Sequence, residues 1–182
     1  MSLPLAPFLA ELTRRIDLAQ LYPPFRDRYL ETLVACHDRG SDYYGISGHR
    51  PIAEQDDLYA IGRAKLADGT WTVVDAGKIV TKAQGGSSAH NYGVATDSSK
   101  DANVDRAGLQ PSWSIADYSV LAEEGERVGL EAAYRWVTFR EGPHLQLPFL
   151  DRGITLAEMR SLYAKGGIPA VWDRLDSVGG KW

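Results

Sequence analysis

The sequence has little cysteine, few histidines and no long apolar run. Its single cysteine, Cys36, excludes an intrachain disulfide and any metal site built from several thiolates. The 4 histidines are therefore the main candidates for metal ligands. No stretch approaches the roughly 20 apolar residues that a membrane-spanning helix requires. We therefore expect no membrane span.

Runs of lysine and arginine are also missing. The net charge of −4 and the pI of about 5.6 do not suit a protein that binds nucleic acid through its phosphates. In the N-terminal stretch MSLPLAPFLAELTRR the basic residues follow a short apolar run, whereas a secretory signal places them before it. We therefore expect a protein without an evident export signal, made in the cytoplasm.

Length and composition indicate one globular domain. A chain of 182 residues matches the roughly 150 residues of a typical domain, and 44% hydrophobic with 24% charged residues is typical of globular proteins. We expect a monomer with a single domain over residues 1–182. Its motif-bearing core covers about residues 41–150, and a helical extension covers about residues 151–182.

Apolar periodicity and end signals predict about four helices and a few short strands. The helices are expected at residues 26–38, 51–62 and 115–128, and after a Thr155–Glu158 capping-box pattern until Gly166-Gly167. Strands are expected at residues 45–47, 78–81, 94–97 and 144–147, with a hairpin turned by Asp68-Gly69. This order has no βαβ rhythm, so we predict an α+β fold with a small, mostly antiparallel sheet flanked by the helices.

The stretch GGSSAHNYGVATD, residues 85–97, places His90 seven residues before Asp97. An odd separation puts two residues on opposite faces of a flat strand, so they converge only if the chain turns between them. Asn91-Tyr92-Gly93 suits such a turn. We expect His90 on a loop and Asp97 pointing inward from the strand that follows.

The stretch FREGPHLQLP, residues 139–148, carries Glu141 and His144. Because Gly142 precedes a proline, it is biased away from helix. The following residues alternate polar and apolar, so His144 and Gln146 share one strand face while the two leucines face the core. Glu141 lies just before this strand and can lean over the same face.

Two imidazoles, one carboxylate and an open position suit a catalytic zinc ion. Bound zinc lowers the pKa of a water molecule toward roughly 7, and Glu141 could accept that proton and pass it to a leaving amine. Arg50 follows a short strand and precedes a helix. Its guanidinium could stabilise a developing oxyanion or bind a substrate carboxylate.

Three stretches, in order, resemble one family. SGHR, then SSAHNYGVATD, then EGPHLQ are similar to zinc peptidases that include D-alanyl-D-alanine carboxypeptidases, vancomycin-resistance dipeptidases and L-alanyl-D-glutamate endopeptidases of phage lysins. The family pattern is S-x-H-x(6)-D followed by E/D-x-x-H. It is filled without a gap by Ser88, His90, Asp97, Glu141 and His144. The resemblance covers about residues 47–147.

The resemblance implies one zinc ion per chain, held by His90, Asp97 and His144. It also implies Glu141 as the base and Arg50 as the carbonyl-stabilising arginine. The stretches at residues 54–55, 58–59 and 77–86 are most similar to the endopeptidase branch. The predicted substrate is therefore a peptidoglycan stem peptide cut between L-Ala and D-Glu, with substrate contacts expected from Ser88, Tyr92 and Gln55.

Other functions remain open on the sequence alone. A D-alanyl-D-alanine carboxypeptidase would use the same zinc chemistry, whereas a zinc-stabilised cell-wall-binding module would have lost catalysis. The presence of Glu141 and Arg50 favours an enzyme over such a module. A phage, effector or housekeeping role is left open. Action on the cell wall is expected after lysis or through dedicated export.

Several residues have two interpretations or depart from the family pattern. Ser98-Ser99 stand where an apolar or aromatic residue is expected, and a hairpin at residues 65–76 looks like an insertion. His49 is expected to be structural or on the rim of the cleft. Cys36 and His37 are interpreted as a helix-packing pair rather than a second metal site. Trp113, Trp136 and Tyr92 either line the cleft or pack in the core.

Overall fold

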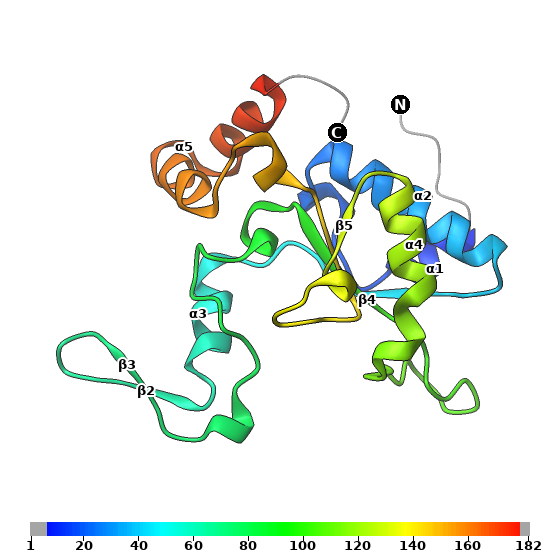
Figure 1. Ribbon diagram of the computed structural model, residues 1–182, viewed down its shortest axis with the longest axis horizontal. Helices are drawn as coiled ribbons and strands as arrows, with labels where there is room; N and C mark the ends of the chain where they lie inside the picture. The colour runs from blue at the N-terminus through cyan, green and yellow to red at the C-terminus, as the bar shows by residue number, and fades with distance from the viewer. Residues whose placement is uncertain (1–6, 179–182) are drawn as a thin grey trace.

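The computed structural model describes residues 7–178, and a four-stranded antiparallel sheet lies at its centre (Figure 1). The strands lie in the order β1 (Tyr44–Ser47), β4 (Ala95–Ser99), β6 (His144–Gln146) and β5 (Glu131–Ala132). A separate hairpin consists of β2 (Arg63–Lys65) and β3 (Trp71–Val73). The predicted α+β class with a small antiparallel sheet is confirmed.

Five α-helices lie around the sheet in the described part of the chain. They are α1 (Pro7–Thr13), α2 (Pro23–Asp38), α3 (Ile52–Ala60), α4 (Ser119–Arg127) and α5 (Leu156–Ser177). In Figure 1, α1, α2 and α4 lie to one side of the sheet, while α3 and α5 lie to the other. None of the helices formed by residues 7–178 has both the length and the apolar character needed to cross a bilayer.

Helix α2 supplies much of the core. It begins at Pro23, earlier than predicted, because two prolines occupy its first positions, where a fixed φ suits the helix and no backbone N–H is lost. Its buried face includes Phe25, Tyr29, Leu33 and Cys36. This face packs on the sheet side opposite the functional residues described below.

The two serines after Asp97 are accommodated by tyrosine hydroxyls. The hydroxyl of Ser98 lies 2.7 Å from that of Tyr29 on α2, and the hydroxyl of Ser99 lies 3.0 Å from that of Tyr118 at the start of α4. All four side chains are buried. A buried hydroxyl is tolerated when it has a hydrogen-bond partner, which explains why this strand does without the apolar residue expected there.

Helix α5 breaks where the glycine pair predicts an end, and then resumes. Gly166 and Gly167 have non-helical backbone angles, and a second helical segment continues to Ser177. Pro169 lies at the start of that segment, a position that proline favours. Within the resumed segment Trp172 donates its indole N–H to the carbonyl of Tyr92 at 2.9 Å, which ties this segment to the turn before β4.

The predicted strand at residues 78–81 is wrong. A short 3-10 helix, η2 (Ala76–Lys78), occupies its start, and the rest is irregular. Side chains, rather than a partner strand, bind the backbone carbonyls of this segment. Arg63 donates to the carbonyl of Thr81 at 2.9 Å, and Gln55 donates to that of Ala83 at 2.8 Å. Neither α1 nor the two-residue strand β5 was predicted.

The predicted hairpin at residues 65–76 is present as β2 and β3. Asp68 accepts hydrogen bonds from the backbone and hydroxyl of Thr70, at 2.9 and 2.6 Å, and so closes the turn. The hairpin projects away from the rest of the molecule beyond α3 (Figure 1). It carries none of the residues that surround Asp97.

Candidate metal centre and cleft

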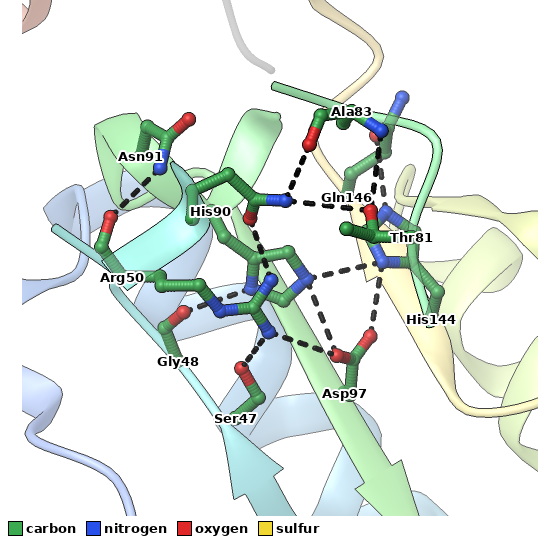
Figure 2. A network of polar contacts seen from close by, with 11 residues as sticks. Ser47, Gly48, Arg50, Thr81, Ala83, His90, Asn91, Asp97, His144 and Gln146 are labelled. Atoms are coloured by element: carbon green, nitrogen blue, oxygen red, sulfur yellow. Dashed lines mark hydrogen bonds and ion pairs between the residues drawn. The ribbon is translucent and has the colours of Figure 1, made fainter. Parts of the chain in front are cut away.

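Strand register places Asp97 beside His144. Asp97 pairs with Ser47 on β1 and with His144 on β6. Side chains at directly paired positions project to the same face of a sheet. Three residues far apart in the sequence therefore lie side by side on one face, as Figure 2 shows.

His90 reaches this face through a short turn. It lies in a 3-10 helix, η3 (Ala89–Tyr92), that begins with a capping box between Ser88 and Asn91. The helix ends at Gly93, which has a positive φ of 69°, a conformation that glycine adopts without strain. The chain therefore doubles back, as the spacing of His90 and Asp97 predicts.

The ligand atoms of His90, Asp97 and His144 have a spacing that suits one metal ion. His90 Nε2 lies 3.3 Å from Asp97 Oδ2 and 3.3 Å from His144 Nδ1, and His144 Nδ1 lies 3.0 Å from Asp97 Oδ1. Ligands about 2.1 Å from a tetrahedral metal ion lie about 3.4 Å from one another. The predicted ligand set is thus brought together as a group able to hold a metal.

The other nitrogen of each histidine has a hydrogen-bond acceptor. His90 Nδ1 lies 2.8 Å from the carbonyl oxygen of Gly48, and His144 Nε2 lies 3.1 Å from Oε1 of Gln146 (Figure 2). These oxygens can only accept, so each of these ring nitrogens carries the hydrogen. His90 Nε2 and His144 Nδ1 are left with free lone pairs for a metal.

A chain of hydrogen bonds continues behind His144. Gln146 Nε2 donates to Glu131 on β5 at 2.9 Å, and the other carboxylate oxygen of Glu131 accepts from the indole of Trp136 at 2.6 Å. Because Glu131 accepts from the nitrogen of the Gln146 amide, the amide oxygen must face His144. Glu131 therefore fixes the orientation of the group that sets the His144 tautomer.

The charges at the centre shift the pKa values of its groups. Burial alone would raise the pKa of Asp97, but His90 and His144 outweigh it and the pKa is lowered. Burial would lower the pKa of His144, but the hydrogen bond that its protonated ring donates to Asp97 outweighs this effect, and the pKa is raised. The carboxylate therefore stays ionised and attracts a cation, which is either the proton on His144 or a metal ion.

Glu141 borders the same cavity as the three ligands and is half-buried. Its backbone N–H donates to the carbonyl of Ala133 at 3.2 Å, which anchors the residue beside the sheet. Burial raises the pKa of its carboxyl group, while the nearby His144 acts in the opposite direction. A carboxylate with a raised pKa is suited to accept a proton and return it.

Arg50 places its guanidinium next to Asp97. It donates to Gln55 Oε1 and to the hydroxyl of Ser47, both at 2.7 Å, and lies 3.8 Å from Asp97 Oδ2. Its backbone N–H donates to the carbonyl of His90 at 3.0 Å. Arg50 is thus held at the metal centre and lines the cavity.

Two cavities meet at Glu141 and Asp97. The first has a volume of about 520 Å³ and also reaches Arg50, His90 and His144. The second has a volume of about 550 Å³, and its wall continues along Ile46, Trp113, Ile115, Arg140, Gly142 and Pro143. The candidate metal centre therefore lies in the first cavity, on the side where this cavity meets the second.

Of the three predicted substrate contacts, the structure brings only Ser88 to a cavity wall. Gln55 is fully buried and binds Arg50 and the carbonyl of Ala83. Tyr92 is also fully buried, and its hydroxyl donates to the carbonyl of Gly86 at 2.8 Å. Both polar groups are therefore already used within the protein, so we place Gln55 and Tyr92 behind the cavity wall.

The structure also shows the surroundings of the tryptophans and of the two histidines outside the metal group. Trp113 is 75% exposed at the second cavity, and Trp136 lines the first, so neither tryptophan is a core residue. His49 lies 2.6 Å from Gln20 through Nδ1 and is outside the metal group. His37 pairs with Asp42 at 2.7 Å and stacks on Phe8, so it takes part in surface packing.

Two residues near the centre were not singled out from the sequence. Lys82 lines the first cavity, and Glu131 supports Gln146 from the edge strand. The partner of Glu131, Gln146, does have a local signal, because it shares a strand face with His144. No local pattern marks Glu131, because its place depends on the pairing of β5 with β6.

The helices and the small antiparallel sheet define an α+β protein. One face of the sheet carries a His–Asp–His group able to hold a metal ion, with a glutamate and an arginine on the same cavity. Residues 19–141 match the model of the VanY family, described as D-alanyl-D-alanine carboxypeptidase. The match covers more than half of the chain, and the protein belongs to this family.

Two individual proteins are similar to the chain. The peptidoglycan L-alanyl-D-glutamate endopeptidase CwlK of Bacillus subtilis strain 168 is 32% identical over 136 residues, which cover 71% of this chain and 74% of that protein. The crystal structure of the Serratia marcescens L-Ala D-Glu endopeptidase ChiX matches with a TM-score of 0.51 and 22% identity. That match covers 79% of this chain and 96% of that one. At this identity the second likeness concerns the fold.

Proposed function

We propose that this protein is a zinc-dependent peptidase that hydrolyses the L-Ala–D-Glu bond of peptidoglycan stem peptides. The observation that carries the proposal is the His90–Asp97–His144 group with Glu141 and Arg50 on the same cavity. Two imidazoles and one carboxylate match the donor set of catalytic zinc sites. Membership of a family described as D-alanyl-D-alanine carboxypeptidase, and the likeness to a named peptidoglycan endopeptidase, support the substrate class.

The reaction divides between the metal and the side chains. His90, Asp97 and His144 would hold the zinc ion, and when bound it would supply polarisation of the scissile carbonyl and a lowered pKa for a water molecule. Glu141 accepts the proton of the attacking water and returns it to the amine that leaves. Arg50 carries a permanent positive charge beside the centre, where it stabilises the negative charge that develops on the carbonyl oxygen.

The two cavities favour an endopeptidase. A carboxypeptidase needs room for only the last residue beyond the scissile bond, whereas an endopeptidase must hold peptide on both sides. Glu141 and Asp97 lie where two hollows of similar size meet. Peptide can therefore extend in both directions from the centre, which agrees with the activity printed for the relative of 32% identity.

A D-alanyl-D-alanine carboxypeptidase is the second candidate, because the family model carries that description. A cell-wall-binding module without catalysis is less well supported. Such a module has no need of a half-buried glutamate with a raised pKa on the cavity, nor of an arginine held beside Asp97.

Digestion of purified peptidoglycan, read by mass spectrometry, tests the proposal. New amino termini on D-Glu, with D-Ala ends intact, are the expected products. Release of free D-Ala without a new D-Glu terminus would identify a carboxypeptidase and leave the zinc mechanism standing. No product with the zinc-loaded protein would point to the binding module. The Glu141→Gln variant, loaded with zinc, serves as the inactive control.

A further inference from the structure

One cation on the first cavity has no anionic partner. Among the side chains that line this cavity, Arg50 is the arginine and Lys82 is the lysine. The guanidinium of Arg50 is engaged by Gln55, Ser47 and Asp97. The ammonium of Lys82 makes no hydrogen bond or ion pair with a carboxylate among residues 7–178, and lies 4.4 Å from the centre of the Phe139 ring.

The backbone on both sides of Lys82 is fixed. Arg63 donates to the carbonyl of Thr81 at 2.9 Å. The buried Gln55 donates to the hydroxyl of Thr81 and the carbonyl of Ala83 at 3.3 and 2.8 Å, and both acceptor residues are labelled in Figure 2. These bonds hold residues 81 and 83 against α3 and the start of β2. Lys82, between them, is exposed on the cavity.

Phe139 supports Lys82 from the other wall of the cavity. It is the one residue other than glycine with a positive φ, 61°, in the described part of the chain, and its side chain is 46% exposed. Both the backbone angle and the exposed ring are unfavourable by themselves. Together they place an aromatic face under the ammonium, a contact that favours a charged lysine.

We propose that Lys82 is a specificity-determining residue, which binds the free carboxylate of the glutamate on the leaving side of the scissile bond. This inference rests on the proposed function. A glutamate linked through its amine and one carboxyl group keeps the other carboxyl group free. The two carboxylates that line the cavity, Asp97 and Glu141, already have roles at the centre, so the substrate supplies the anion that Lys82 lacks.

The assignment also orients the peptide. Lys82 and Phe139 line the first cavity and not the second. The leaving glutamate therefore occupies the first cavity, and the alanine side of the bond extends toward Trp113 and Ile115. The cation on the second cavity, Arg140, is turned to Tyr134: its Nε donates to that carbonyl at 2.7 Å.

The test compares two peptides that differ in one group. One contains L-Ala–D-Glu with the free carboxylate, and the other has the same carboxylate as a primary amide. For each zinc-loaded protein the ratio of kcat/KM on the acid peptide to that on the amide peptide is measured. The wild type should prefer the acid peptide about three- to tenfold, the range of an exposed charge pair with a charge-assisted hydrogen bond.

Three variants make the comparison specific. Lys82→Met, which keeps most of the side-chain length but loses the charge, should bring the ratio close to one. Lys82→Arg should keep the preference for the acid peptide. Lys78→Met removes an exposed lysine of the same segment that pairs with Asp75 and lies off both cavities, and should keep the wild-type ratio.

The inference and the proposed function fail in different ways. A wild type that cuts both peptides without preference, or a Lys82→Met variant that keeps the wild-type ratio, overturns the role of Lys82 alone. A wild type that forms no new D-Glu amino terminus from either peptide overturns the proposed bond, and the role of Lys82 with it.

Discussion

Asp97 and His144 lie directly opposite each other on β4 and β6, and Asp97 Oδ1 is 3.0 Å from His144 Nδ1. The register of one strand pair therefore places two predicted ligands side by side. A shift of one residue would turn one of them to the helix-covered face, because side chains alternate along a strand. The candidate metal centre thus depends on the same pairing that forms the middle of the sheet.

Metal content follows from the ligand group. The purified protein should hold about one zinc ion per chain, removable by a chelator with loss of activity that zinc restores. Zinc should also raise the Tm, because free ligand at about 100 times its Kd stabilises the native state by about 2.7 kcal/mol. Elemental analysis should find no zinc in His144→Ala but normal zinc in His49→Ala, whose ring lies outside the group. Full activity after verified metal removal would contradict the assignment.

Glu141→Gln should separate proton transfer from metal binding. The amide cannot accept the proton of the attacking water, so kcat should fall roughly 10²–10⁴-fold while zinc content stays normal. Glu54→Gln, an exposed change in the first turn of α3, is the matched control and should retain turnover. A Glu141→Gln variant with wild-type kcat would show that another group moves the proton.

Glu131 should influence zinc affinity without touching the metal. Glu131→Ala frees the Gln146 amide to rotate, so His144 loses the acceptor that sets its tautomer. Loss of such outer partners typically weakens metal binding about 10–100-fold. Competition with a chromophoric chelator measures this affinity, and nitrogen chemical shifts of His144 report the tautomer. Glu54→Ala is the control; equal affinity and an unchanged tautomer in Glu131→Ala would refute the role.

Gly93 should be costly to replace. Its positive φ of 69° and the nearby backbone carbonyl of Gln20 both oppose a side chain. Gly40 has a similar φ of 70° but open space around it, so Gly40→Ala should lose about 1 kcal/mol. Gly93→Ala should lose more, by about 1–3 kcal/mol, and bind zinc less well because His90 shifts. Urea unfolding of the two variants makes the comparison, and equal losses would remove the steric argument.

Because of Cys36, the free energy of unfolding should fall as the pH rises in the alkaline range. Burial raises the pKa of its thiol to about 12, above the roughly 8.5 of an exposed thiol. The neutral thiol is favoured in the folded state. Its contribution to the free energy of unfolding is therefore fully present below about pH 8.5 and is lost as the pH rises toward 12. Between about pH 8 and pH 10 the loss should reach about 2 kcal/mol at most. Urea unfolding of Cys36→Ala should show a much flatter pH dependence, and an equal dependence would contradict the prediction.

Local sequence patterns predicted the helices α2 to α5, the strands that carry His144 and Asp97, and the turn that follows His90. The spacing of His90, Asp97 and His144, with turn residues between the first two, is readable because strand alternation and turn propensity act over a few residues. The prolines at the start of α2 and the glycine pair in α5 also act locally. For that reason the α+β class and the turn before β4 were predictable.

Only the tertiary structure decided which polar groups face the cleft and which are used within the protein. Gln55 and Tyr92 were expected at the substrate, but long-range bonds to Ala83 and Gly86 hold them in the interior. Glu131 and Lys82 carry no local signal, since their surroundings come from segments distant in the sequence. Hydrogen-bond partners across a fold depend on strand pairing and loop packing, which residue order alone does not specify.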